Sequence, residues 1–291
     1  MSAAHANSDH YYVPHGSHWP IVGSIGLFTT LSSAALWLED VSVGRYLFPV
    51  GLCIILFMMF GWFGTVIRES ESGTYNEQVD RSFRWGMTWF IFSEVMFFAA
   101  FFGALFYARN FALPWLGGAG KHLFTNLILW HGFEANWPTN GPGGVGGAFK
   151  AMEALGIPAL NTAILLTSGL TVTIAHWGLK GGDRKKLCLF LLFTIILGFS
   201  FVALQAHEYH DAYTKQNLTL GSGIYGSTFF MLTGFHGLHV TIGAIMLSVI
   251  LFRSLKGHFT ADHHFAFEAV SWYWHFVDVV WLGLYIFVYW L

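Results

Sequence analysis

The sequence predicts an all-α, polytopic membrane protein with seven transmembrane helices. Only 10% of its 291 residues are charged and 55% are hydrophobic, whereas about 25% of the residues of a soluble domain are charged. Seven apolar stretches reach the roughly 20 residues that a helix needs to cross a bilayer. The 30 Phe, 13 Trp and 11 Tyr residues suit lipid-facing and interfacial surfaces. This composition excludes an ordinary soluble protein, and the net charge of -2 gives no indication of a nucleic-acid partner.

The seven expected helices fall into two groups along the chain. Their approximate ranges are 20–38, 45–66, 84–108, 159–179, 186–207, 224–252 and 269–290. The third and sixth are long, which implies tilt or extension beyond the membrane. The polar loop after the second stretch is the expected boundary between a two-helix unit at 20–66 and a five-helix bundle at 84–290, and a tail at 1–19 precedes both.

Basic residues in the loops predict how the chain crosses the membrane. The loops after the second, fourth and sixth stretches carry nine Lys and Arg residues, against five on the opposite side. The positive-inside rule therefore places the N-terminus in the cytoplasm and the C-terminus outside. The tail holds His5, His10, His15 and His18 without the basic segment of a signal peptide. We expect an uncleaved, solvated tail rather than a metal site.

Only one loop, at 109–158, is long. It contains a glycine-rich run at 141–147 and three tryptophans, which suggest that part of it lies on the membrane surface. Long loops of this kind are usually functional or mobile.

The two cysteines, Cys53 and Cys188, lie in separate apolar runs. The sequence contains no CxxC motif for metal binding or redox chemistry. We therefore expect both to be small buried hydrophobic residues.

Glu94 lies about ten residues into the third stretch, near the middle of the membrane. An ionised carboxylate is expensive at that depth, so burial favours its neutral form. Glu94 is either a proton-handling carboxylate or a hydrogen-bond anchor between helices. The simplest alternative is a protonated side chain bonded to one neighbour without a dynamic role.

His236 and His239 share one face of the sixth stretch, where three glycines allow close approach of another helix. Two histidines could bind a metal or haem, but one helix cannot supply both axial sides of a haem. His176 could face them, although it lies close to the cytoplasmic end. We favour hydrogen bonding over metal binding, with Glu94 bonded to His239 or His236.

The last stretch carries His275 and Asp278 on one helical face, flanked by Trp274 and Trp281. Such residues are common where a helix end meets the headgroup region. The predicted orientation, however, places His275 and Asp278 about two to three turns into the membrane. We therefore favour a paired, buried polar contact between helices.

Arg68 and Arg253 stand at the cytoplasmic ends of the second and sixth stretches, and their guanidinium groups match phosphate oxygens. Trp62, Lys256 and His263 lie close to them in the chain. The residues alone allow a lipid-headgroup site or simple interfacial anchoring, and for isolated arginines they favour anchoring.

Seven segments, in order along most of the chain, carry a family resemblance. They are Trp19-Pro20; VIRES at 66–70; RWGMTWFIFSEVMFF at 84–98; LNTAILLTSG at 160–169; Leu204-Gln205-Ala206 with Glu208-Tyr209; YGSTFFMLTGFHGLHVTIG at 225–243; and HFTADHHFAFEAVSWYWHFVDVVW at 258–281. With these segments the sequence closely resembles subunit III of the cytochrome c oxidase complex, a haem–copper terminal oxidase. The loop at 109–150 departs from the family pattern because it is longer and richer in glycine than in shorter members.

The resemblance implies seven helices in a 2 + 5 arrangement around a cleft that holds phospholipid. Arg68 and Arg253 match positions that contact lipid phosphates, and Glu94 matches an intramembrane carboxylate. Subunit III carries no haem, copper or other metal of its own, because those centres belong to subunits I and II. Those subunits oxidise cytochrome c, which subunit III is not expected to contact, reduce O2 and pump protons.

The resemblance also implies the role of this subunit. It packs on subunit I and supports proton uptake, O2 access and stability during turnover. We expect a bacterial-type inner membrane or an equivalent respiratory membrane.

Two alternatives remain open at this point. Subunit III of a quinol oxidase typically lacks the first two helices, which this chain has. A stand-alone proton-coupled transporter would use intramembrane residues such as Glu94, His236, His239 and Asp278. The sequence, however, shows no inverted repeat and no pair of broken helices.

Overall fold

The computed structural model describes residues 12–13 and 16–291, and every regular element in this part of the chain is a helix. The chain divides into two compact units, Met1–Trp85 and Gly86–Leu291. The predicted two-helix unit at 20–66 and five-helix bundle at 84–290 stay a prediction. His5, His10 and His15 of the tail lie outside the described residues.

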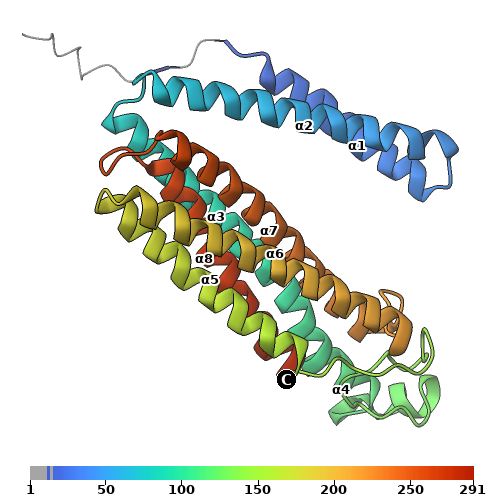
Figure 1. Cartoon of the computed structure of the whole chain (residues 1–291). Helices are drawn as coiled ribbons and strands as arrows, with labels where there is room; N and C mark the ends of the chain where they lie inside the picture. The colour runs from blue at the N-terminus through green and yellow to red at the C-terminus, as the bar shows by residue number, and fades with distance from the viewer. Residues whose placement is uncertain (1–11, 14–15) are drawn as a thin grey trace, which may run out of the picture. The chain divides into compact units, whose positions relative to one another are not determined.

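The first unit is built on helices α1 (Trp19–Leu38) and α2 (Ser42–Glu71), which run side by side in opposite directions (Figure 1). Glycine allows this close approach, because a Cβ atom on Gly51 would collide with the backbone of Thr30. The pair is also joined at its other end, where the Trp19 indole donates to the Thr65 hydroxyl over 3.3 Å.

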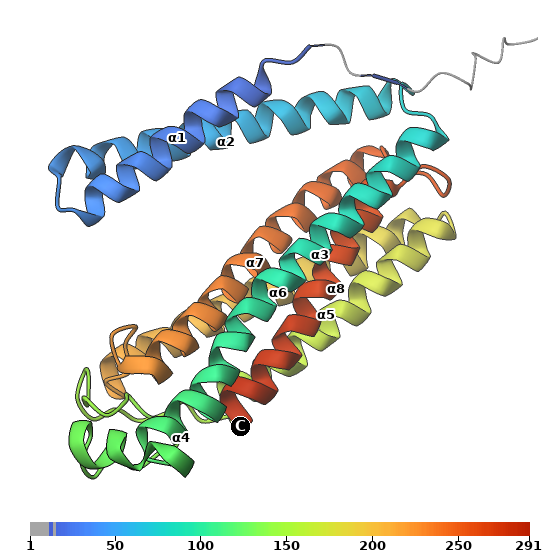
Figure 2. The ribbon, with the colours of Figure 1, turned by 180° about the vertical axis from the view of Figure 1, so that it is seen from behind.

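The second unit is a bundle of five long helices, which Figure 2 shows from behind. They are α3 (Glu77–Tyr107, whose first turns belong to the first unit), α5 (Ile157–Lys180), α6 (Arg184–Lys215), α7 (Gly223–Lys256) and α8 (Phe265–Leu284). Trp274 and Trp281 of α8 are fully buried at the centre. Two glycines, Gly198 of α6 and Gly243 of α7, leave room for the Trp274 ring, because a Cβ atom on either would come within 3.0 Å of it.

The predicted helical membrane fold is confirmed. Among the described residues, six helical stretches are long and apolar enough to cross a membrane. They are α1, α2, α5, α6, α7 and the continuous stretch Glu77–Leu116, which begins with α3. The seventh predicted span corresponds to α8 and the π-helical turn Tyr285–Trp290 that follows it. Its mean hydropathy is lower than that of the other six because it is rich in His, Trp and Tyr and contains two carboxylates. The lipid-holding cleft and the orientation stay predictions.

Several helices extend beyond their apolar stretches. Helix α3 begins at Glu77 rather than near 84, α6 continues to Lys215, and α8 begins at Phe265 rather than near 269. Polar residues continue the backbone hydrogen bonding past the region that hydropathy marks. These helices are therefore longer than their apolar stretches, because polar residues form their terminal turns.

The long loop is partly helical. It contains π-helical turns at Ala108–Ala112 and Thr125–Leu129, the short helix α4 (Leu113–Leu116) and a 3-10 turn at Gly120–His122. Its later part is fastened to the bundle, since the backbone N–H of Met152 donates to the Tyr225 hydroxyl over 3.3 Å. The expectation that both cysteines are buried was wrong, because Cys53 is exposed and Cys188 is only partly buried.

Candidate functional site

Glu94 of α3 and His239 of α7 form a hydrogen-bonded pair within the five-helix bundle. His239 Nε2 lies 2.8 Å from Glu94 Oε2, and the two side chains are 12% and 22% exposed. The rings of Phe97, Phe98 and Tyr273 stand within 5.0–6.3 Å of the imidazole ring. The predicted hydrogen bond between Glu94 and a histidine of the sixth span is therefore present, and His239 is its partner.

The backbone fixes which nitrogen of His239 faces the carboxyl group. Nδ1 donates to the carbonyl of Phe235 over 2.6 Å, so the hydrogen of a neutral imidazole is committed there and Nε2 presents its lone pair. An oxygen at 2.8 Å from that lone pair requires a proton between the two atoms. The pair therefore shares one proton, either as neutral Glu94 with neutral His239 or as a carboxylate with an imidazolium.

His236 belongs to a different contact, although it shares a helical face with His239. It is fully buried, and its Nε2 lies 3.2 Å from the carbonyl oxygen of Val277 in α8. The rings of Phe201 and Trp281 enclose it, with centroids 5.5 and 5.0 Å away. His236 thus joins α7 to α8, whereas His239 joins α7 to α3, and the two form no shared metal set.

The polar residues of α8 contact a row of small polar residues on α5. His275 Nε2 lies 3.3 Å from the Thr173 hydroxyl, and its Nδ1 lies 3.5 Å from Asp278 Oδ2 within the same helix. Asp278 is buried against Gly169, where a Cβ atom would collide with its carboxylate. The sequence favoured a buried polar contact between helices for His275 and Asp278. Asp278 is buried at this seam, whereas the His275 side chain is 45% exposed.

The two flanking tryptophans of α8 belong to the same seam. The Trp274 indole donates to the Ser168 hydroxyl and the Trp281 indole to the Thr162 hydroxyl, each over 2.9 Å. An indole N–H that is buried needs such a partner. These bonds fix the rotation and the register of α8 against α5.

The basic residues predicted to bind lipid lie at helix ends. Arg68 is exposed at the end of α2 and donates to the Thr65 hydroxyl over 3.2 Å, and Trp62 is exposed one to two turns earlier. Arg253 is partly buried in the last turn of α7, with its guanidinium carbon 4.6 Å from the centroid of the Phe259 ring. Lys256 and His263 are exposed. Arg68 belongs to the first unit and Arg253 to the second, and their lipid-binding role stays a prediction.

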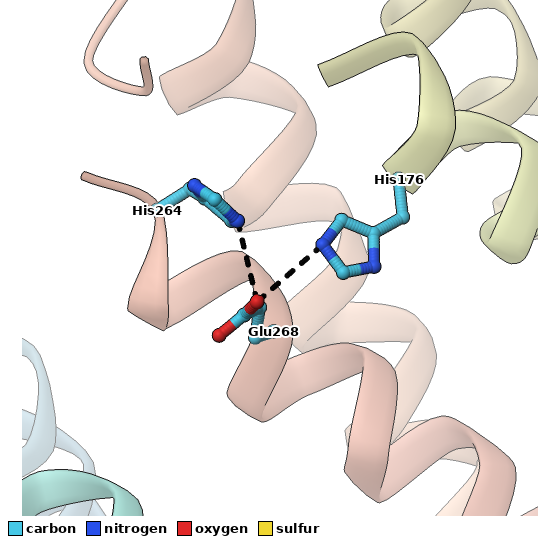
Figure 3. A group of neighbouring side chains, drawn as sticks. All are labelled: His176, His264 and Glu268. Carbon is cyan, nitrogen blue, oxygen red and sulfur yellow. Dashed lines mark ion pairs between the residues drawn. The ribbon is translucent and has the colours of Figure 1, made fainter. Parts of the chain in front are cut away.

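The burial of Glu208 and the grouping of His176 with His264 and Glu268 were not predicted from the sequence. Glu208, near the end of α6, is 1% exposed, and neither of its oxygens accepts a hydrogen bond from the described residues. It sits in the polar run HEYHD, which resembles an ordinary helix end. His176, His264 and Glu268 converge between α5 and α8 (Figure 3). The spacing of four residues between His264 and Glu268 was the available signal.

Comparison with known proteins agrees with these features. The family model described as cytochrome c oxidase subunit III matches residues 9–291. Proteins named cytochrome c oxidase subunit 3 from Formosania lacustris and Coturnix japonica are each 43% identical over 281 residues, and the one from Squalus acanthias is 42% identical. Each alignment covers 96% of both chains. The resembling segments on α3 and on α5 to α8 lie where the buried polar contacts are made. Because the family model and the relatives cover nearly the whole sequence, the chain belongs to the cytochrome c oxidase subunit III family.

Proposed function

We propose that this chain is an accessory, non-redox subunit of a proton-pumping cytochrome c oxidase, the role expected from its family. It packs on subunit I, in a complex that also contains subunit II, and binds structural phospholipid. Through these contacts it supports proton uptake, O2 access and resistance to inactivation during turnover. The intramembrane histidines favour this role because His236, His239 and His275 contact groups of this same chain.

The outer surfaces of the helices support the proposed packing against lipid and partner subunits. Of the 18 most apolar consecutive residues of α2, only 6% are buried within the chain, whereas 39% of those of α7 are buried. Phe57, Phe60 and Phe63 of α2 are between 63% and 79% exposed. Apolar side chains directed outward on a membrane helix require hydrocarbon or another helix around them.

The lipid proposal rests on Arg68 and Arg253, each placed where a helix ends. A guanidinium group can bind a phosphate with two parallel hydrogen bonds. We expect the double variant Arg68→Ala with Arg253→Ala to lose bound phospholipid from the purified complex, as measured by lipid mass spectrometry. Lys150→Ala is the control, because Lys150 pairs with Glu153 in the exposed loop. Full lipid retention in the double variant would refute the assignment.

The accessory role is tested by removing the chain from the complex. We expect the remaining subunits to keep a nearly unchanged haem spectrum and their initial electron transfer, and to lose activity sooner during turnover. Complete loss of initial electron transfer in a correctly assembled complex of subunits I and II would contradict an accessory role.

The proposed orientation has the N-terminus in the cytoplasm of a bacterial-type inner membrane, or on the equivalent side of another respiratory membrane. The bundle end that carries Lys180 and Arg184 would then face the cytoplasm. Cysteines introduced at Gly182 and at Gly143 should react with an impermeant reagent from opposite sides of the membrane. Labelling of both from one side would overturn the orientation.

A further inference from the structure

The first part of the long loop, residues 113–133, folds into a hairpin that projects from the end of α3 (Figures 1 and 2). We refer to these residues as the loop hairpin. The helix continues from α3 through α4, and the chain then reverses direction at Gly118, where φ is +83°. Asn126 on the returning arm closes the hairpin, because its Nδ2 donates to the carbonyl groups of Leu116 and Phe133 over 3.3 and 2.9 Å.

The returning arm of the loop hairpin exposes a group of large apolar side chains. Leu123 and Leu127 are four residues apart, as are Phe124 and Ile128, so each pair shares a helical face. Together with Leu129, these side chains are between 48% and 72% exposed. A contiguous apolar surface of this kind marks a place where a protein contacts another molecule or a membrane.

Contacts within the hairpin and at its base hold this apolar surface outward. Leu113 is buried at the start of the hairpin, and the rings of Trp115 and His122 join its two arms with centroids 5.1 Å apart. A Cβ atom on Gly117 would lie 2.8 Å from that of Ala135, where the chain leaves the hairpin. The exposed residues therefore belong to a folded unit.

The second part of the loop differs from the hairpin because it packs on the bundle. The rings of Trp137 and Phe149 lie with their centroids 5.6 and 5.3 Å from that of Tyr225 in α7. Asn140 Nδ2 donates to the carbonyl of Val145 over 3.1 Å and so closes the glycine-rich turn between them. Of the surfaces offered by the loop, the hairpin is the one that carries the contiguous apolar group.

The loop hairpin starts close to the membrane. The helical stretch Glu77–Leu116 is continuous, and the apolar span predicted within it ends near 108. Residues 109–116 rise at most about 12 Å along a helix axis, and the headgroup region on each side of the hydrocarbon is about 5–8 Å thick. Because the chain reverses direction at Gly118, the returning arm stays within reach of the boundary between headgroups and acyl chains.

The charges of the hairpin favour a lipid surface. Residues 95–133 contain no Asp or Glu. Lys121 and His122, at the tip of the hairpin, are exposed directly before the apolar group. Apolar and aromatic side chains next to a basic residue, without acidic ones, are typical of segments that lie in the membrane interface and attract anionic lipids.

We propose that the loop hairpin is a membrane-interface anchor. Phe124, Ile128 and their apolar neighbours enter the boundary between headgroups and acyl chains of the leaflet at the end of α3, and Lys121 lies at the level of the lipid phosphates. The anchor would hold the long loop against the bilayer beside the bundle. It depends neither on the proposed phosphate contacts of Arg68 and Arg253 nor on any proton role.

The test identifies what surrounds the apolar group in the assembled complex. The photoreactive residue p-benzoylphenylalanine, which forms a bond with a nearby C–H group on irradiation, is placed at Phe124, at Ile128 or at Val145. Val145 is the matched control, because it is an exposed apolar residue in the second part of the same loop. The oxidase complex is reconstituted in vesicles of phosphatidylcholine and phosphatidylglycerol, irradiated, and analysed by mass spectrometry of this chain.

We expect phospholipid adducts at Phe124 and at Ile128 to exceed those at Val145 about ten-fold, because acyl chains surround the first two positions and water the third. All three side chains are exposed, so the probe displaces no packed neighbour. Cross-links from Phe124 and Ile128 to another subunit would overturn the anchor and assign the surface to a protein contact. Equal adducts at all three positions, or none at any, would also overturn it.

A second measurement tests the place of Lys121 at the phosphates. With the probe at Phe124, Lys121→Ala should lower the ratio of phosphatidylglycerol to phosphatidylcholine adducts about five-fold, since a basic residue close to the surface favours anionic lipid by about that factor. Lys150→Ala is the control, because Lys150 pairs with Glu153 in the second part of the loop. An unchanged ratio in Lys121→Ala, or an equal fall in both variants, would refute this placement.

Discussion

The Glu94–His239 hydrogen bond offers the sharpest test of the interior of this protein. His239 has committed Nδ1 to the carbonyl of Phe235, so Nε2 is the only atom through which it can bond Glu94. Glu94→Ala, His239→Ala and the double variant form a double-mutant cycle. The cycle isolates the free energy of this one contact from the cost of truncating each side chain.

The expected coupling free energy depends on whether the pair is neutral or consists of a carboxylate and an imidazolium. Hydrogen bonds between membrane helices contribute about 0.6 kcal/mol on average and about 1.7 kcal/mol at most. Leaving a buried charge without its partner costs about 3–5 kcal/mol. We expect a coupling of about 1–2 kcal/mol, between these two limits, because the pair is only partly buried, with side chains 12% and 22% exposed. Glu94→Gln should cost less than Glu94→Ala, since its amide can donate to Nε2.

The free energies are measured by unfolding the complex with sodium dodecyl sulfate in mixed micelles. A second cycle with His236→Ala in place of His239→Ala is the control, because His236 contacts Val277 instead. The control coupling should stay within about 0.5 kcal/mol of zero. Infrared spectra should show a changed carboxyl band in Glu94→Gln. Zero coupling for Glu94 with His239, together with an unchanged band, would refute the shared-proton pair.

Two further predictions concern packing and pH. Gly243→Ala should destabilise the protein by about 1–3 kcal/mol in the same unfolding assay because its methyl group meets the Trp274 ring, whereas Gly103→Ala, which meets nothing, should not destabilise it. Tyr75→Phe should cost about 1 kcal/mol, because the hydroxyl donates to Glu69 over 2.7 Å. Burial and this carboxylate raise the pKa of Tyr75, so the contribution should persist at pH 10 and disappear only as pH rises through the higher folded value. Equal losses for both glycines, or a Tyr75 contribution lost below pH 10, would contradict these arguments.

Hydropathy and residue depth were sufficient to predict the helices and the bond to Glu94. They could not choose between His239 and His236, since both share a helical face. The choice depends on how α7 is rotated between α3 and α8, and that rotation is set by side chains from three helices at once. Gly243 and Trp274 illustrate this, because their contact brings α7 and α8 together from distant positions in the sequence.

The hydrogen-bond partners of Trp274 and Trp281 in α8 could not be predicted from the sequence either. Ser168 and Thr162 are small polar residues inside an apolar helix, and such residues commonly bond their own backbone. Both do so here, to the carbonyls of Leu165 and Pro158 respectively. Only the position of the facing indoles shows that each hydroxyl also accepts a bond from α8. Hydroxyl groups with this double use carry no distinctive sequence pattern.

The cluster of His176, His264 and Glu268 shows how a small error in a helix boundary hides a contact between helices. The apolar pattern predicts a helix from about 269, which leaves Glu268 and His264 in a loop beside the lipid-binding candidate His263. The helix begins at Phe265 instead, one turn earlier. That turn places Glu268 directly above His264, while His263 points outward and is exposed. Because adjacent residues at a helix start point in different directions, the His263–His264 pair divides into one surface residue and one buried residue that faces Glu268.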